Sequence, residues 1–314
     1  MKKISILCTV VVALTLVCTF ASRAGDRSGT VAGQFLKIDV SARAIGMGGA
    51  QVAVADGASS LAYNASGILS VADYGFAATY TAWFANIQHS YASVVKNIPN
   101  VGAIGASFIM MATDDMIETT PQYPEGTGQT FRASEYAFSL AFARQVTEQF
   151  RLGLNAKVIQ SYLFNTELGS SSFAVDVGTM YDIPLLHSHI GVSLTNIGKD
   201  LKYINETYSI PTALRFGITL DVLKDPGNQN QFVTVFQIAR ANDSQEQYNL
   251  GGEYLFDNVL ALRAGYKFAY DQENVTAGFG LRLNPMGLNT TLDYGYNNFK
   301  YLPGTHSFTF EFQF

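Results

Sequence analysis

Residues that could perform catalysis or bind a metal are scarce in this sequence. It has four histidines, and only His187 and His189 are spaced to place two imidazoles on one strand face, where they could bind a metal. No third ligand lies near them in sequence, and they adjoin an expected tight turn, so a solvated turn is the favoured interpretation. Neither a G-x-S-x-G elbow nor a P-loop occurs. A Ser–His–acid set assembled by folding stays open, but the pattern favours a protein that is not an enzyme and has no cofactor or metal.

A glycine cluster is the second candidate for chemistry. Gly46, Gly48 and Gly49 follow the stretch Ala42–Ile45, but their spacing is not the G-x-G-x-x-G of a dinucleotide site. The glycines favour tight turns and close packing of the backbone against a wall.

Charge and composition limit the class of protein further. The 314 residues are 48% hydrophobic and only 14% charged, against about 25% charged residues in a typical soluble protein. The net charge is −5, so there is no excess of basic residues to neutralise phosphates. We expect no binding to nucleic acid.

Most of the chain alternates with a period of two. In one run Val275, Phe279 and Leu281 oppose Gly278 and Gly280, and in general one face is large and apolar while the other mixes glycine, serine, threonine and charges. About fourteen such runs occur, at residues 73–84, 87–97, 101–112, 133–146, 150–163, 171–183, 187–196, 210–222, 230–241, 246–256, 259–270, 273–284, 287–297 and 304–314. Each is near the ~9–11 residues that a tilted strand needs to cross a bilayer. The pattern predicts an all-β transmembrane antiparallel barrel over residues 73–314; a secreted sandwich is the alternative.

The connections between these runs alternate in length. Tight turns such as Pro285-Met286 alternate with generally longer loops, of which 113–132 and 197–209 are the longest. Bacterial outer-membrane barrels have short periplasmic turns and long outside loops. An even number of strands then places both termini in the periplasm.

Residues 1–24 have the layout of a signal peptide. Lys2 and Lys3 precede an apolar run, and Ser22-Arg23-Ala24 offers small residues at a cleavage site. A retained anchor helix is the alternative. Both cysteines lie in this segment, so we expect an exported mature chain without thiols, bound for the outer membrane.

Residues 25–72 do not follow the strand pattern. They are rich in glycine, alanine and serine, and Ser41 could cap a short helix over Ala42–Ile45, followed by an extended Gln51–Ala55. A segment of low bulk ahead of the first strand suits a hatch folded into the lumen, which a barrel of fourteen strands would otherwise leave open.

Charged residues on the polar face of the strands are expected to face that lumen. Unpaired buried charge is costly, so they should pair with each other or with the hatch, where Arg43 is the obvious cation; hydrated side chains without defined partners are the alternative. The expected lumen charges are Glu135, Arg144, Lys157, Asp176, Arg215, Glu253, Arg263, Lys267, Arg282, Asp293 and Glu311.

The C-terminal run ends in four alternating phenylalanines, Phe308, Phe310, Phe312 and Phe314. An edge strand with such a face would promote aggregation in a soluble protein. In a closed barrel it would pair with the first strand and face lipid. A terminal phenylalanine also resembles the signal read by the outer-membrane assembly machinery.

The hatch sequence resembles the N-terminus of PorV/PorQ family proteins, within the wider FadL-like group of fourteen-stranded barrels. The resemblance rests on Phe35-Leu36-Lys37-Ile38, Ser41-Ala42-Arg43-Ala44-Ile45-Gly46-Met47-Gly48-Gly49-Ala50, Val52-Ala53-Val54-Ala55-Asp56, Tyr63-Asn64 and Gly67-Ile68-Leu69. The group usually has Asn-Pro-Ala where this chain has Asn64-Ala65-Ser66.

This resemblance implies one of two roles in the outer membrane. The first is a PorV-like, non-enzymatic scaffold of type IX secretion that receives the signal domains of secreted cargo or contacts a translocon. The second is a FadL-like channel for hydrophobic small molecules. A dry lumen pocket of ~300 Å³ or more would favour the channel, whereas the many lumen charges favour the scaffold.

Overall fold

The computed structural model describes residues 29–164, 168–184, 188–223 and 230–314. The expected signal peptide and His187 lie outside the described residues. Within them, no helix combines the length and the apolar character needed to cross a bilayer.

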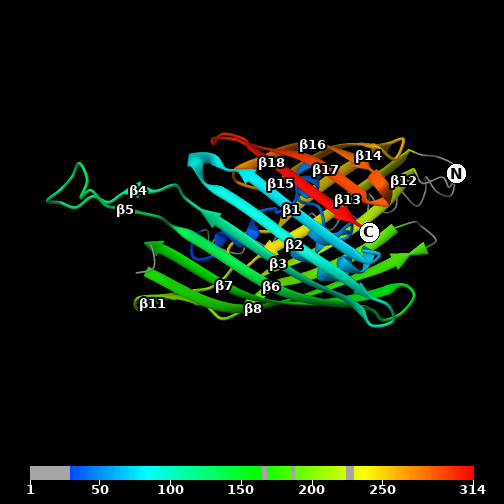
Figure 1. The fold of residues 1–314 in the computed structure, drawn as a ribbon, viewed down its shortest axis with the longest axis horizontal. Coiled ribbons are helices and arrows are strands. Elements are labelled where there is room, and N and C mark those ends of the chain that lie inside the picture. The colour runs from blue at the N-terminus through cyan, green and yellow to red at the C-terminus, as the bar shows by residue number, and fades with distance from the viewer. Residues whose placement is uncertain (1–28, 165–167, 185–187, 224–229) are drawn as a thin grey trace.

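Fourteen antiparallel strands form a closed barrel (Figure 1), as the period of two predicts. Around the wall the strands follow chain order, and β18 pairs with β1. Their bounds are β1 Tyr74–Ala82, β2 Gln88–Ile98, β3 Gly102–Ala112, β6 Ser134–Gln145, β7 Phe150–Phe164, β8 Leu168–Ile183, β9 Ser188–Gly198, β12 Ala213–Leu223, β13 Gln231–Ala241, β14 Gln247–Phe256, β15 Leu260–Phe268, β16 Glu273–Leu283, β17 Asn289–Phe299 and β18 Thr305–Gln313.

The two faces of each strand meet different surroundings. In β6, Phe138 and Leu140 are 54% and 71% exposed on the outer face, while Ala137, Ser139 and Ala141 are buried inside. Large apolar side chains on the outside and small or polar ones inside are the pattern of a barrel that is solvated by lipid.

Closure of the barrel uses the C-terminal strand. Phe308 and Phe310 of β18 lie opposite Tyr80 and Ala78 of β1, and the Tyr74 and Phe314 rings stack with centroids 5.1 Å apart. Phe308, Phe310 and Phe314 are exposed on the outer face.

The barrel has two unlike ends. We call the end with the tight turns, including η6 Pro285–Gly287, the turn end, and the opposite one the loop end. The long connections at the loop end contain two further hairpins, β4 Met116–Ile117 with β5 Thr130–Phe131, and β10 Leu201–Tyr203 with β11 Glu206–Tyr208. The β4–β5 hairpin projects far beyond the wall (Figure 1). The short η4, Phe84–Asn86, joins β1 to β2.

The segment ahead of β1 fills the lumen as a hatch. It contains η1 Gln34–Lys37, α2 Ala42–Gly46, η2 Ala58–Ala62 and η3 Ala65–Ser70. Ser41 precedes α2 without a side-chain cap. The expected extended stretch at Gln51–Ala55 is wrong, because Val54 N–H donates to the Gln51 carbonyl (3.1 Å) and closes a turn.

The hatch crosses the lumen from one end to the other. Val31 pairs with Ser209 of the loop end, whereas the Val71 carbonyl accepts from Asn97 Nδ2 (2.9 Å) at the turn end, close to where β1 begins. The described chain therefore starts at the loop end, whereas β1 starts at the turn end. An even number of strands determines at which end of the barrel the first strand begins and the last one ends, but it does not determine the course of the hatch. The expected periplasmic N-terminus lies outside the described residues.

Candidate functional site: the hatch and the charged lumen

Glycines on the inner wall let the hatch backbone touch the barrel directly. A Cβ built on Gly251 would lie 2.9 Å from the Met47 Cβ and closer still to the Met47 carbonyl, and one on Gly46 of the hatch would lie 3.1 Å from the Gly278 Cα. Real Cβ atoms essentially never lie closer than 3.0 Å to such a neighbour, and at 3.1 Å the neighbour would have to shift. Ten wall glycines, each with its built Cβ close to a hatch atom, form what we call the glycine girdle: Gly75, Gly105, Gly153, Gly178, Gly191, Gly217, Gly251, Gly265, Gly278 and Gly295.

The glycines of the hatch have the complementary role. Gly48 and Gly49 have φ values of +67° and +74°, a region that costs glycine little and other residues more. They turn the chain after α2, and Met47, the residue before them, is fully buried. These contacts agree with the tight turns and close packing expected from the sequence.

Asn64 fixes the turn before η3. Its side chain is 1% exposed; Nδ2 donates to the carbonyls of Val52 and Thr179 (both 2.9 Å), and Oδ1 accepts from Ser66 N–H (3.2 Å). The amide thus holds the turn at Asn64-Ala65-Ser66 without a proline.

Arg43 joins the hatch to the wall by a bidentate ion pair. Its Nε and Nη2 donate to the two Glu253 carboxylate oxygens at 2.9 and 3.0 Å, and Nη1 donates to Asp56 of the hatch. The expected contact between Arg43 and a wall carboxylate is therefore present. Two parallel charge-assisted bonds fix direction as well as distance.

Glu253 is also bonded to the wall itself. Arg263 donates through Nε to Glu253 (2.6 Å) and through Nη1 to Asp293 (2.6 Å), and Arg282 lies 3.3 Å from Glu253. The Arg263 and Glu253 side chains are 0% and 4% exposed. Burial of charge is tolerable here because each buried carboxylate faces a guanidinium.

Further ion pairs and hydrogen bonds hold the hatch at other positions along the barrel axis. Lys267 Nζ lies 3.1 Å from Asp39 and 2.9 Å from Glu273. Near the turn end, Ala58 N–H donates to Glu311 (2.7 Å).

At the loop end, Lys37 and Gln34 both donate to Asp243, at 2.8 and 2.9 Å. Burial alone would raise the pKa of Asp243, but these two partners outweigh it and hold that pKa below its ordinary value.

Sequence reasoning missed several anchors that carry no charge. Gln237 Oε1 accepts from the N–H groups of Gln51 and Val52, and its Nε2 donates to the Gly49 carbonyl (3.1 Å). Asn249 Nδ2 donates to the Gly48 carbonyl (2.6 Å). The alternation along their strands places Gln237 and Asn249 on the lumen face, but only charged residues were predicted as anchors from the sequence.

The remaining lumen charges bind wall partners. Lys157 Nζ pairs with Asp176 (2.8 Å), Arg215 donates to Thr195 (2.9 Å), and Glu135 accepts from Ser161 (3.0 Å).

Arg144 is a correction. It is exposed, shares the even parity of the outward Phe138, Leu140 and Phe142, and lies opposite Leu152 of β7. The inward placement expected for Arg144 is wrong because side chains two residues apart on a strand share a face, and Arg144 follows the outward Phe142 by two residues in an unbroken register.

His189 pairs with the Asp182 carboxylate. Its Nδ1 lies 2.8 Å from Asp182, which also accepts from Arg151 (2.6 Å). Among the described residues no group of three histidine, cysteine or acidic side chains could hold a metal.

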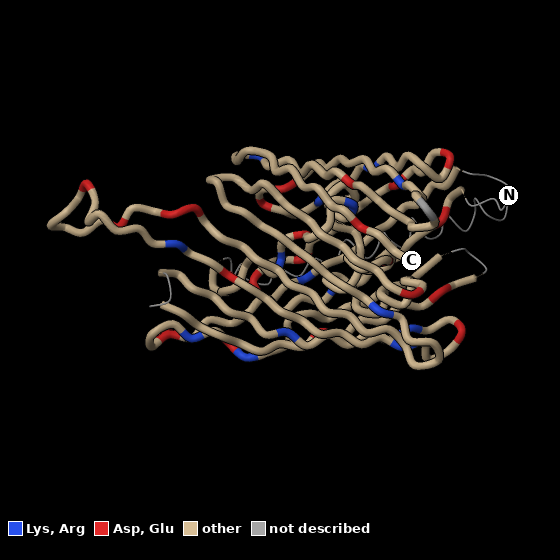
Figure 2. Tube along the Cα trace, viewed as in Figure 1, with Lys and Arg blue, Asp and Glu red and all other residues tan. Residues whose placement is uncertain are grey.

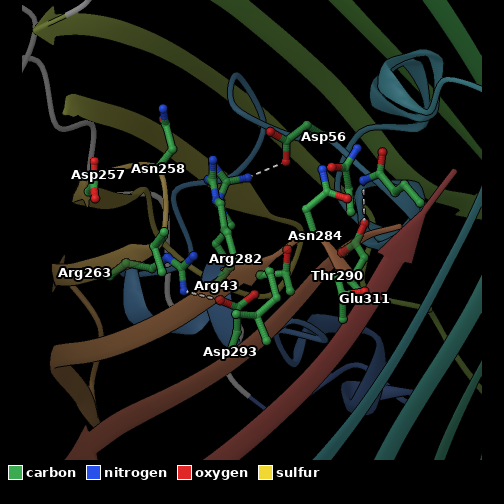
Figure 3. Close-up of a pocket in the computed structure, with 15 residues that line it drawn as sticks. Arg43, Asp56, Asp257, Asn258, Arg263, Arg282, Asn284, Thr290, Asp293 and Glu311 are labelled. Atoms are coloured by element: carbon green, nitrogen blue, oxygen red, sulfur yellow. Dashed lines mark hydrogen bonds and ion pairs between the residues drawn. The ribbon is translucent and has the colours of Figure 1, made fainter. Parts of the chain in front are cut away.

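A cavity of about 540 Å³ opens beside Arg43 near the turn end (Figure 3). Its lining includes seven ionisable side chains, Arg43, Asp56, Asp257, Arg263, Arg282, Asp293 and Glu311. Such a lining suits water, not a fatty acyl chain.

Removal of Arg43 should loosen the hatch while the barrel survives. In Arg43→Ala, Glu253 keeps Arg263 and Arg282 as partners, so the wall stays neutralised, but α2 loses its bidentate anchor. We expect faster protease cleavage within residues 29–72 and current fluctuations in planar bilayers. Arg240→Ala, which removes an exposed arginine paired with Glu246, is the control; equal behaviour of the two variants would deny Arg43 an anchoring role.

Solved structures share this fold. The CymD monoaromatic hydrocarbon channel has 13% sequence identity and a TM-score of 0.62, covering 87% of this chain and 96% of its own. The Ralstonia pickettii toluene transporter TbuX has 11% identity and a TM-score of 0.58, covering 88% and 99%. A Pseudomonas aeruginosa FadL homologue has 10% identity and a TM-score of 0.54, covering 92% and 99%. At these identities the likeness shows the fold alone.

The sequence comparisons name a family. No curated protein sequence matches this chain. The family model described as type IX secretion system protein PorV matches residues 21–241, more than half of the chain and including the whole hatch together with the wall through β13. This outer-membrane β-barrel therefore belongs to the PorV family.

Proposed function

We propose that this barrel is a non-enzymatic scaffold of type IX secretion, which binds secreted cargo or the translocon at its loop end. The observation that carries the proposal is the combination of a filled lumen with a long hairpin that projects from the loop end. The hatch obstructs the passage of solutes through the lumen, whereas the projecting hairpin is accessible to a protein partner.

The filled lumen is the first line of support. The glycine girdle places hatch atoms against the wall backbone on ten of the fourteen strands, and Arg43, Lys267 and Glu311 bind the hatch to the wall at several positions along the lumen. Passage of a solute would require these contacts to break together.

The β4–β5 hairpin is the second line of support. Ile117 and Tyr123 are 65% and 63% exposed, and within the described residues β4 and β5 form a separate two-stranded sheet. Unpaired strand edges with exposed apolar side chains can accept a strand from a partner. Acidic residues mark it (Figure 2), among them Asp114, Asp115, Glu118 and Glu125, which favours a basic partner surface.

The proposed partners in the membrane are lipid and the assembly machinery. The outer aromatic face of β18 supports this proposal, because its phenylalanines are exposed on the outside of the wall.

We place the loop end outside the cell, following the rule that periplasmic turns are short. Cysteines introduced at Gln122 in the β4–β5 hairpin and at Glu148 in the β6–β7 turn are both at exposed positions. An impermeant maleimide added to whole cells should label position 122, and position 148 only after lysis. The reverse pattern would invert the orientation.

The function is tested by altering the hairpin alone. In Ile117→Asp/Tyr123→Ser the barrel should fold normally, because the hairpin lies beyond the wall, but release of type IX cargo into the medium should fall at least several-fold. Tyr301→Ser changes a residue that is 83% exposed in another loop of the same end and should leave release unchanged. A photo-crosslinking residue at position 123 should capture cargo or translocon in wild-type cells.

The competing proposal is a channel for hydrophobic molecules. It predicts normal cargo release from the hairpin variant and solute uptake that depends on the barrel. Normal cargo release without crosslinks at position 123 would overturn the scaffold proposal in its favour.

A further inference from the structure

A second lumen cavity, of about 240 Å³, lies near the loop end between the hatch and strands β15 to β18. Its lining includes four apolar side chains, Ile38, Ile45, Trp83 and Phe299. The Trp83 and Phe299 rings meet edge to face with centroids 5.7 Å apart. The volume lies below the ~300 Å³ at which pockets for drug-sized ligands begin, so the occupant must be small.

Two residues of the lining, Asn297 and Gln272, carry hydrogen-bond acceptors that lack donors within the described residues. Asn297 is 4% exposed; its Nδ2 donates to Glu273, but its Oδ1 has no hydrogen-bond partner within the described residues. The Oε1 of Gln272, also in the lining, is buried and equally without a donor there. Buried acceptors left unpaired cost free energy, and a ligand with hydrogen-bond donors could supply the missing partners.

The charge around the cavity favours a cation. Three carboxylates line it, Asp39, Asp271 and Glu273, against the two ammonium groups of Lys37 and Lys267. The charge of Lys37 is already matched by Asp243 outside the lining. The lining therefore has an excess of negative charge, and an aromatic ring such as Trp83 adds a further attraction for cations.

We propose that this cavity binds a small primary ammonium compound with an apolar or aromatic group. The ammonium donates to Asn297 and Gln272 near the Glu273 carboxylate, and the apolar group lies against Trp83 and Phe299. A hydrocarbon would leave the two acceptors unpaired, and an anion would meet the excess of carboxylates.

Trp83 provides the readout, since it is the chain's one tryptophan and lines the cavity. The purified full barrel in micelles of uncharged detergent is titrated with benzylamine, toluene or benzoate. We expect a saturable change of Trp83 emission with benzylamine and none with benzoate. Toluene should bind at least tenfold more weakly, as expected for loss of hydrogen bonds from a charged donor. Toluene binding as tight as benzylamine, or no saturable response to benzylamine, would overturn the proposal.

Two variants distinguish the site from simple partition into the micelle. Asn297→Leu and Gln272→Leu each remove one orphan acceptor and should weaken benzylamine binding about tenfold. Asn298→Leu changes the next residue of β17, which has its own partner in Asn274, and should bind as the wild type does. Folding of each variant is checked by heat-modifiable migration in gels. Equal affinity in all three folded variants would refute the site, and this result is independent of any secretion role.

Discussion

Gly251→Ala is expected to force the hatch away from the wall, although it adds a single methyl group. The new Cβ would meet the Met47 Cβ at 2.9 Å and the Met47 carbonyl oxygen at a still shorter distance, and backbone atoms cannot move aside as a flexible side chain can. Overpacking typically costs ~1–3 kcal/mol. We expect rapid proteolysis within residues 29–72 and a marked rise of conductance in planar bilayers.

The adjacent glycine supplies a matched control. A Cβ on Gly252 points to the outer face, where its nearest neighbour is Phe232 at 3.6 Å, an ordinary contact. Gly252→Ala should therefore leave both protease resistance and conductance unchanged. If the two alanine variants behaved alike, the glycine girdle would have no part in holding the hatch.

Phe310→Lys is expected to prevent accumulation of folded protein in the outer membrane. Phe310 lies near the middle of β18, on the outer face opposite Ala78 and Leu292. A lysine facing lipid near the bilayer midplane costs ~2–4 kcal/mol, and β18 is the strand that closes the barrel. The measurement is the amount of heat-modifiable protein in purified outer membranes.

The same lysine on the inner face should be tolerated. Thr291 lines the polar cavity and lies opposite Glu311, so the ammonium of Thr291→Lys has water and a carboxylate nearby. Normal accumulation of Phe310→Lys together with loss of Thr291→Lys would invert the inside–outside assignment.

The wall was predictable from sequence because lipid and lumen impose the same alternation on every strand. All fourteen runs correspond to strands, with ends displaced by a few residues: the run at 210–222, for example, is β12 at Ala213–Leu223. Strand ends are harder to predict because outside the bilayer no face has to be apolar. At such an end a charged side chain can lie on the outer face, as Arg144 does in β6.

The hatch was predictable only in outline. Its short helical turns follow local signals, such as the glycines after α2, but Arg43 and Glu253 are 210 residues apart in the chain. No local pattern says which of many wall carboxylates meets Arg43. The girdle was hidden as well, because a glycine on the lumen face of a strand looks the same whether it contacts a hatch or water.

The course of the hatch has a consequence for the order of assembly. The described chain begins at the loop end, passes through the whole lumen and joins β1 at the turn end. A finished barrel whose wall touches that chain on ten strands offers no space through which it could be threaded afterwards. We infer that the hatch is already in place when β18 meets β1, so that the strands close around it and it serves as the internal template on which the barrel forms.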